Sequence, residues 1–474
     1  MPAFSLEPEQ AAWCAELRAL AAERLRPLAE RGEPGRVNRP LVAELGRLGL
    51  LDRLFASGAL GLCLMRESLA YVCTEAETAL ALQGLGAHPV HAYGTPEQRA
   101  RWLPGVRAGS VVAAFALSEP GAGSDAAALS LRAEPQAPPA TDHTRPAAAS
   151  ATGHAPAAAA PCTAAGAAGH APPTCASAAA APATGHTPAT AARAAGHAPP
   201  PATAPPADAP PATEPPATAP STTPPSAPAL SAEADGPRRW RLTGEKCWIS
   251  NAPEADFYTV FARTTAAGAR GVTAFLVPAD RPGLTGAGLD MLSPHPIGSL
   301  RFDAVPVTAD DVLGETDRGF RVAMGTLNLF RPSVGAFAVG MAQAALDACL
   351  AHTAARDAFG GKLRDLQAVA HQVAEMAVRT EAARLLVYAA ATAYDDGADG
   401  LARRAAMAKL LATETAQYVV DAAVQLHGAR ALLRGHLLEH LYREVRAPRV
   451  YEGASEVQRG IIAKELYAAR EARP

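Results

Sequence analysis

The sequence predicts an α+β fold in three successive parts. These are an N-terminal α-helical domain over residues 1–110, a middle β barrel or sandwich over residues 111–316, and a C-terminal α-helical domain over residues 317–474. In the first and last parts, hydrophobic residues recur every three or four positions, which is the period of one buried helix face. Between them lie short runs rich in β-branched and aromatic residues, separated by Gly, Asn and Pro, and such runs are typical of strands.

The N-terminal part carries both the helical period and a helix start signal. Leu41 and Leu45 belong to one apolar stripe. Thr95, Pro96 and Gln98 form a helix entry, with Thr95 as the N-cap, Pro96 at the first helical position and Gln98 at the capping-box position.

The middle part reads as strands at short spacing. A buried strand is expected over Val111–Leu117, which ends at the sequence Glu-Pro-Gly. Further strands are expected at Trp240–Leu242, Cys247–Ile249, Phe257–Phe261 and Val272–Val277.

A low-complexity insertion interrupts this β domain over residues 132–229. It holds 23 of the 42 Pro residues of the chain and contains no Leu, Ile, Val, Met, Phe, Tyr, Trp or Lys. Such a segment cannot bury a core, so we expect it to be disordered. Four Gly-His-Ala/Thr-Pro units within it could bind a metal weakly, but composition favours a solvated loop, and we predict no metal site. Its flanks, Ala126–Leu131 and Trp240–Leu242, should be adjacent strands or strand ends, so its two ends should lie close together.

Composition excludes several classes of protein. With 43 basic and 46 acidic residues and a formal net charge of −3, the chain offers no electrostatic footprint for nucleic acid. No stretch approaches 18 uninterrupted apolar residues, which argues against a membrane span. The seven Cys residues form no CxxC pair, so free thiols in a reducing compartment, and hence a cytoplasmic location, are expected.

Two segments carry the most specific signals. The turn Gly121-x-Gly123-Ser124 follows a predicted buried strand, and its N–H groups and hydroxyl could bind an anion, although most such turns are only turns. Glu452 lies in a Gly-containing loop at a helix entry. Most such Glu residues are solvated or cap a helix, and the alternative is a catalytic base.

Six motifs in order carry a family resemblance: Ala114–Asp125, Leu242–Asn251, Arg356-x-x-Phe359-Gly360, Leu366-Gln367, Gln425–Gly428 and Tyr451–Arg459. Together they resemble the acyl-CoA dehydrogenase family from Phe4 to Tyr467, with the insertion excluded. The resemblance implies a C-terminal four-helix bundle domain, FAD as cofactor, an acyl-CoA substrate and a homotetramer, or a dimer.

For catalysis, the resemblance implies that Glu452 removes the α proton of an acyl-CoA thioester while the flavin accepts the β hydride. The N–H group of Glu452 should help to polarise the thioester carbonyl. Some branches of the family place the base on a helix, directly before the position of Arg331. Here that position is Phe330, which cannot accept a proton. The residues implied on the substrate side are Ser124, Asn328, Arg331, Tyr451 and Gly453.

For the cofactor, the resemblance implies contacts with the flavin ring, the pyrophosphate and the FAD of a neighbouring subunit. The positions are Phe115, Leu117, Ser118, Ser124, Trp248, Ile249, Ser250, Arg356, Phe359, Gln367, Gln425, Leu426, Gly428, Ala454, Ser455 and Glu456. Trp248 should shield the flavin from water, and its alternative interpretation is a core aromatic residue of the β domain.

Three features depart from the family pattern. Ala429 replaces a usual Gly, Ala454 replaces a usual Thr, and the segment Leu51–Cys63 is short and lacks a typical Tyr-Gly-Gly loop. The first hypothesis is a dehydrogenase that passes electrons to an electron-transferring flavoprotein or a similar acceptor. The alternatives are an acyl-CoA oxidase, a dehydrogenase of acyl groups tethered to a carrier protein, or a non-catalytic flavoprotein or scaffold.

Overall fold

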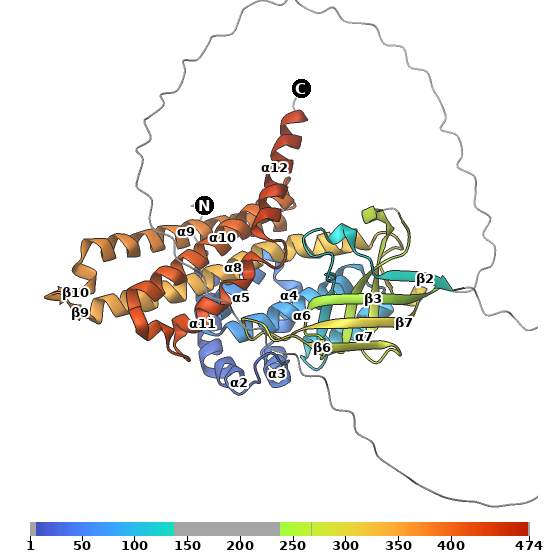
Figure 1. The fold of residues 1–474 in the computed structure, drawn as a ribbon, viewed down its shortest axis with the longest axis horizontal. Helices are drawn as coiled ribbons and strands as arrows, with labels where there is room; N and C mark the ends of the chain where they lie inside the picture. Colours follow the sequence, from blue (N-terminus) through green and yellow to red (C-terminus); the bar gives the residue numbers. More distant parts are fainter. Residues whose placement is uncertain (1–5, 137–237, 267, 473–474) are drawn as a thin grey trace, which may run out of the picture. The chain divides into compact units, whose positions relative to one another are not determined.

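The computed structural model describes residues 6–136, 238–266 and 268–472 (Figure 1). The predicted disorder over residues 137–229 and the four Gly-His units therefore lie outside the described residues. Within the described part, helices, then a sheet, then helices follow one another along the chain, which confirms the α+β class.

The N-terminal part is helical throughout. Its helices are α1 (Pro8–Leu20), α2 (Arg26–Ala29), α3 (Arg39–Arg47), α4 (Leu50–Ala56), α5 (Gly58–Val72), α6 (Thr74–Tyr93) and α7 (Pro96–Arg107). The capping box of α7 is confirmed, because Gln98 N donates to Thr95 Oγ1 at 3.2 Å and Thr95 N donates to Gln98 Oε1 at 2.9 Å. Helices α5 and α6 are buried over most of their length, so they form the interior of this part.

The middle part is one connected sheet of eight strands in the order β6-β7-β3-β2-β4-β5-β8, with β1 paired in parallel to β4. The strands are β1 (Ala113–Ala116), β2 (Arg132–Gln136), β3 (Arg239–Ser250), β4 (Phe257–Arg263), β5 (Val272–Pro278), β6 (Leu284–Gly288), β7 (Ile297–Thr308) and β8 (Val312–Leu313). In a flat sheet, three strand spacings, roughly 14 Å, would separate β3 from β5. The rings of Trp240 on β3 and Phe275 on β5 are nevertheless 5.6 Å apart. The sheet therefore bends around its own core.

The insertion begins later than the sequence predicted. Residues Arg132–Gln136, which were assigned to it, form β2 and pair with β3, and Ala133 is buried. Ladder hydrogen bonds come from the main chain, so a segment poor in large apolar side chains can still complete a sheet. The flank Ala126–Leu131 is not a strand and contains a short 3₁₀ turn. Gln136 pairs with Arg239, so the described residues on either side of the insertion lie close together, as expected.

The C-terminal part consists of α8 (Gly319–Ala355), a short hairpin of β9 (Asp357–Ala358) and β10 (Gly361–Lys362), α9 (Gln367–Asp395), α10 (Leu401–His427), α11 (Leu437–Glu444) and α12 (Ser455–Glu471). Helices α8, α9 and α10 pack on one another, α12 packs on α10, and α8 also packs on α5. In the described part of the chain, α8 is the one helix long and apolar enough to cross a membrane. However, 72% of its most apolar window is buried, as in the core helix of a folded domain.

Helix α8 determines how far the C-terminal part extends from the sheet. At its start, a Cβ on Gly319 would lie 2.4 Å from Ala274 N of β5, so the helix begins directly against the sheet. At 1.5 Å per residue, its 37 residues span roughly 55 Å. Figure 1 shows the β9–β10 hairpin at the end of α8 opposite the sheet.

Candidate active site

Glu452 lies in a tight loop between α11 and α12 whose main chain is strained. The φ angles of Glu452 and Gly453 are 52° and 94°, in a region that L residues other than Gly rarely adopt. The side chain of the fully buried Gln458 holds this loop, because its Nε2 donates to Glu452 O at 3.1 Å and to Gly453 O at 2.9 Å. Lys409 Nζ of α10 also donates to Gly453 O, at 2.7 Å. The loop is therefore fixed from two helices.

The carboxyl group of Glu452 is desolvated. Its Oε2 is buried and has no hydrogen-bond partner among the described residues. Burial raises the pKa of this carboxyl above its ordinary value, although the charges of Arg66, Lys409 and Arg331 partly offset that effect. A carboxylate with a raised pKa and an unpaired oxygen is suited to act as a general base.

Helix α8 forms a wall beside this loop. Arg331 Nε donates to Glu452 O at 3.3 Å, and Arg331 Nη1 lies 3.5 Å from Asn328 Oδ1. Phe330 is buried, and a Cβ at position 84 of α6 would lie 2.9 Å from its ring, so Gly84 is needed for this packing. The structure thus brings Glu452, Arg331 and Asn328 together and places an apolar ring at position 330.

The residues that follow β1 are tied to β3. Leu117 O accepts from Lys246 Nζ at 2.9 Å, and Ser118 O accepts from Cys247 N at 3.0 Å. Phe115, on β1, packs its ring 4.9 Å from that of Phe261. Two predicted motifs that lie far apart in the sequence are therefore adjacent in the fold.

A buried ion pair that the sequence analysis missed anchors this junction. Lys246 Nζ lies 2.8 Å from Glu119 Oε1, and both side chains are almost fully buried. Glu119 also accepts from Ser130 N at 2.6 Å, Ser130 Oγ at 2.7 Å and Leu131 N at 2.9 Å. Both residues belong to the family motifs named above, and Lys246, a charged residue within the expected strand region, was the available signal.

Trp248 is exposed, so its alternative interpretation as a core aromatic residue of the β domain is wrong. It lies at an irregularity in the pairing of β3 with β7, has a φ angle of 57°, and is 49% exposed. Ile249 is buried and Ser250 is half-buried. Gly123 and Ser124 are exposed, and a Cβ on Gly123 would meet nothing within 4 Å.

These residues fit a flavin nucleotide by the chemistry of their side chains. Phe115 and Trp248 offer partly exposed aromatic surface beside the loop that follows β1, and an isoalloxazine ring stacks on such surface. Ser118 and Ser124 offer hydroxyl donors, and the open turn at Gly121 and Gly123 suits close approach of a phosphate.

Other predicted cofactor positions lie far from this group. They follow the far end of α8 or lie in α9 and at the end of α10, and they are Arg356, Phe359, Gln367, Gln425, Leu426 and Gly428. All except the half-buried Leu426 are exposed. About 55 Å of helix separates Arg356 from the sheet, so one chain does not bring the two groups together.

The start of α12 uses its polar groups within the protein. Ser455 Oγ donates to Glu414 Oε1 at 2.5 Å, and Arg449 also pairs with Glu414, at 2.9 Å. Ala454 is the N-cap of α12 and makes no side-chain cap, while Glu456 is exposed and lies 3.5 Å from Arg459. The hydroxyl of Ser455 is therefore engaged by a protein carboxylate.

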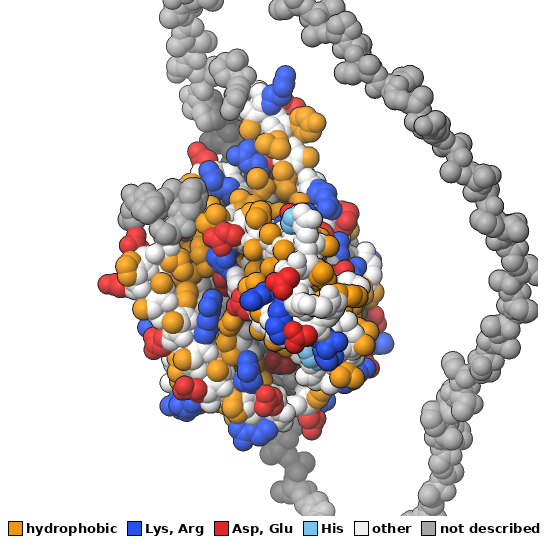
Figure 2. Space-filling model, turned by 90° about the vertical axis from the view of Figure 1, so that its left-hand side faces the viewer, with side chains coloured by type: hydrophobic (Ala, Val, Ile, Leu, Met, Phe, Trp, Pro, Cys, Tyr) orange, Lys and Arg blue, Asp and Glu red, His pale blue; other side chains and the backbone are white. Residues whose placement is uncertain are grey.

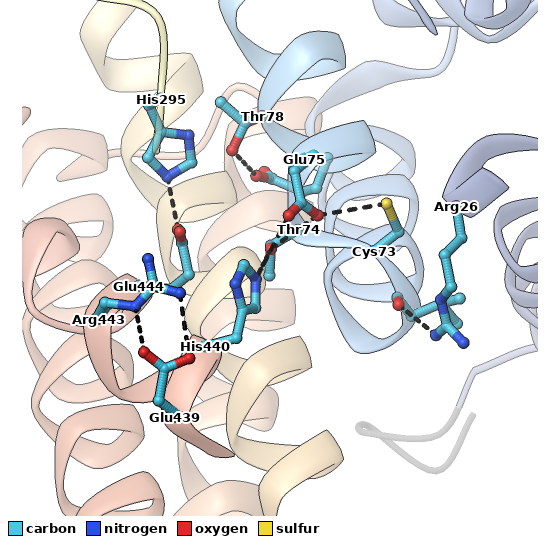
Figure 3. A network of polar contacts seen from close by, with 12 residues as sticks. Arg26, Cys73, Thr74, Glu75, Thr78, His295, Glu439, His440, Arg443 and Glu444 are labelled. Atoms are coloured by element: carbon cyan, nitrogen blue, oxygen red, sulfur yellow. Dashed lines mark hydrogen bonds and ion pairs between the residues drawn. The ribbon is translucent and has the colours of Figure 1, made fainter. Parts of the chain in front are cut away.

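A second polar network, which sequence reasoning did not find, surrounds α11 (Figure 3). His295, from the loop between β6 and β7, contacts Glu444 at the end of α11, with 2.5 Å between Nε2 and Oε2. His440 of α11 reaches Thr74 of α6, with 2.6 Å between Nε2 and Oγ1. Helix α11 is thus linked both to the sheet domain and to the N-terminal helices.

Comparison with known proteins places these features in a family. The N-terminal, middle and C-terminal domains of acyl-CoA dehydrogenases match residues 7–110, 212–305 and 317–467. The chain belongs to the acyl-CoA dehydrogenase family. Enzymes of this family use FAD.

Individual relatives agree with that assignment. The chain is 38% identical over 239 residues to the probable acyl-CoA dehydrogenase FadE25 of Mycobacterium tuberculosis, across 50% of this chain and 61% of that protein. It is 40% identical over 240 residues to the human mitochondrial short-chain specific acyl-CoA dehydrogenase, across 50% of this chain and 58% of that protein. These alignments thus span about three fifths of the length of the curated relatives.

Among solved structures, butyryl-CoA dehydrogenase from Megasphaera elsdenii is similar to the chain with a TM-score of 0.72 and 25% identity. That likeness covers 98% of this chain and 99% of the other.

Proposed function

We propose that the protein is an FAD-dependent acyl-CoA dehydrogenase in which Glu452 removes the α proton of the substrate. The observation that carries this proposal is the Glu452 carboxyl group, which is desolvated and has an oxygen without a partner among the described residues. The N–H group of Glu452 donates to the thioester carbonyl and stabilises the charge that develops there. When bound, FAD supplies the acceptor for the β hydride.

The residues that hold the flavin are those joined by the Lys246–Glu119 pair. Phe115, Leu117 and Trp248 would cover the flavin ring, and Ser118 would donate a hydrogen bond to it. Ser124 would contact the pyrophosphate and the CoA moiety. The support for this placement is that the ion pair fixes the Leu117 carbonyl, and hence the loop that follows β1.

We also propose a homotetramer, because the predicted cofactor-binding residues of one chain lie in two groups near opposite ends of α8. Arg356, Gln367 and Gln425 would reach the FAD of a neighbouring subunit. The end of the molecule that carries them exposes large apolar side chains: Phe359, Val378, Leu432, Leu433 and Leu437. Figure 2 shows hydrophobic side chains spread over the face at this end. Sedimentation of the FAD-bound protein as a monomer would contradict the proposal.

For the electron acceptor we propose an electron-transferring flavoprotein. A matched solved structure carries the description "Electron transferring flavoprotein of Acidaminococcus fermentans", with 25% identity and a TM-score of 0.72. Peroxide release on turnover would instead indicate an oxidase, and dependence on a carrier protein would indicate a tethered substrate. The described cysteines, Cys14, Cys63, Cys73, Cys247 and Cys349, are free thiols, which supports a cytoplasmic location.

The test is anaerobic bleaching of the bound flavin by a panel of short, branched, aromatic and long acyl-CoAs. Glu452→Gln should lower the rate of flavin reduction at least a hundredfold, because general-base catalysis contributes about 10²–10⁴-fold. Glu375→Gln changes an exposed α9 residue in the same way and should leave the rate unchanged. Bleaching at the original rate by Glu452→Gln would refute the base assignment, and no bleaching together with no bound FAD would favour a scaffold.

A further inference from the structure

Helix α5 carries a buried cation that the proposed reaction does not use. The side chains of Arg66 on α5 and Glu77 on α6 form an ion pair and are 4% and 1% exposed. Arg66 Nη1 also donates to Ser333 Oγ at 2.7 Å, and Ser333 Oγ donates to Phe330 O. Burying such a pair costs several kcal/mol in desolvation, so its presence inside an apolar helix bundle calls for a physical role.

The pair lies beside the proposed base. Ser333 and Phe330, which Arg66 contacts directly or through one bond, flank Arg331 on α8, and Arg331 donates to Glu452 O. The charge of Arg66 also acts on the Glu452 carboxyl and on Tyr451. The guanidinium is therefore bonded to the same turn of α8 that holds the Glu452 loop.

Among the residues that the structure describes, one amino group of this guanidinium has no hydrogen-bond acceptor. In the described ranges, the hydrogen bonds of Arg66 run from Nε to Glu77 and from Nη1 to Ser333, so Nη2 is left over. Glu452 Oε2 is fully enclosed and has no partner among the described residues. Arg66 Nη2 is not fully enclosed in this way, so part of its surface is accessible. A guanidinium cannot give up its charge, so this donor calls for an acceptor.

The charges around Arg66 select a neutral acceptor. Glu77 already neutralises Arg66, and the charge of Glu452 is also offset by Lys409 and Arg331. An acyl group that ended in a carboxylate would lie beside the Glu77 carboxylate, and like charges repel in a buried site. A hydroxyl or carbonyl oxygen would accept the bond without that cost.

We propose that Arg66 is a specificity-determining residue of the acyl site, and that its Nη2 donates to a neutral oxygen on the acyl chain of the substrate. This inference rests on the proposed function. A site built to bond an oxygen leaves its own buried donor unpaired when a plain alkyl chain binds instead. The enzyme should therefore prefer an acyl-CoA with a terminal hydroxyl to the isostere with a terminal methyl.

The experiment compares anaerobic flavin reduction by ω-hydroxyacyl-CoAs and by their methyl-terminated isosteres over short and medium chain lengths. The wild-type holoenzyme should favour the best hydroxylated substrate at least roughly tenfold, as a hydrogen bond to a charged donor implies. The double variant Arg66→Met/Glu77→Gln should lose that preference. The control variant Glu67→Gln/Arg384→Met removes a neighbouring pair between α5 and α9, with 2.9 Å between Arg384 Nε and Glu67 Oε1. This variant should keep the preference for the hydroxylated substrate.

The outcomes separate the two proposals. Equal or better reduction by the methyl-terminated series in the wild-type enzyme would overturn the role of Arg66 and leave the dehydrogenase proposal intact, and this comparison needs no variant to fold. A preference that survives Arg66→Met/Glu77→Gln would do the same. Preference for a dicarboxylic acyl-CoA would overturn the neutral acceptor. Bleaching by neither series nor by any other acyl-CoA would refute the proposed function, and this inference with it.

Discussion

Replacing Lys246 with Met should both destabilise the protein and weaken its hold on FAD. Lys246 Nζ is fully buried and bonds Glu119 Oε1 and Leu117 O. Removing one member of a buried ion pair typically costs about 3–5 kcal/mol, because the other charge is left uncompensated. Here Glu119 keeps three donors, from Ser130 and Leu131. We therefore expect a loss near the lower end, about 3 kcal/mol.

The effect on FAD follows from the second bond of Lys246. Leu117 O lies between two proposed flavin contacts, Phe115 and Ser118, and loses its buried donor in the variant. Leaving one buried acceptor unpaired costs about 1–3 kcal/mol. If half of that appears in cofactor binding, the dissociation constant for FAD should rise about two- to tenfold.

The assay is urea unfolding of the FAD-free protein, together with FAD titration by flavin fluorescence. Lys246→Met/Glu119→Gln should recover part of the lost stability, because no unpaired charge remains. Arg379→Met breaks an exposed pair with Glu375 and should change stability by less than about 1 kcal/mol. A Lys246→Met protein with wild-type stability and wild-type FAD affinity would refute the reasoning.

Two further predictions concern pH. Lys409→Met removes a cation that lowers the pKa of Glu452. Because a base works only when it is deprotonated, the acid limb of the flavin-reduction rate should move to higher pH, and an unmoved limb in stopped-flow measurements would contradict this. Burial lowers the pKa of His295, but the carboxylates of Glu444, Glu77 and Glu75 together raise it above the ordinary 6.5. The stability that His295 adds relative to His295→Gln should therefore be fully present below pH 6.5 and be lost as pH rises through the folded pKa. Equal thermal midpoints for the two proteins across that range would contradict this.

Local patterns predicted the elements that have strong local signals. The capping box at Thr95 and the strands β4 and β5, which are continuous apolar runs, follow from short stretches of sequence. Strands β6 and β7 were not predicted, because Leu284–Gly288 is short and rich in Gly, and Ile297–Thr308 contains Pro and charged residues. Both gain their place from pairing with partners distant in sequence, which no local pattern encodes.

The candidate site divides in the same way. Glu452 and the residues after β1 could be predicted because they stand in contiguous motifs. Arg66 and Glu77 are 11 residues apart on different helices, and their pairing depends on how α5 and α6 pack. A single Arg in the apolar run of α5 was the available signal. The 55 Å between Arg356 and the sheet also appears only in the fold, because it depends on the unbroken length of α8.

The placement of charge around Glu452 explains how one carboxyl group can be ionised and still accept a proton from carbon. Burial raises the pKa of this carboxyl, and a direct salt bridge would lower the pKa but occupy the lone pairs of the oxygens. Here Lys409 bonds Gly453 O and Arg331 bonds Glu452 O, so both cations are fixed on main-chain carbonyls. In the described part of the chain neither donates to the carboxyl oxygens. Their charges therefore favour the ionised base through space, while its oxygens remain free to face the α carbon. Position 330, directly before Arg331, carries the apolar Phe330 and so adds no carboxylate that could compete for the proton.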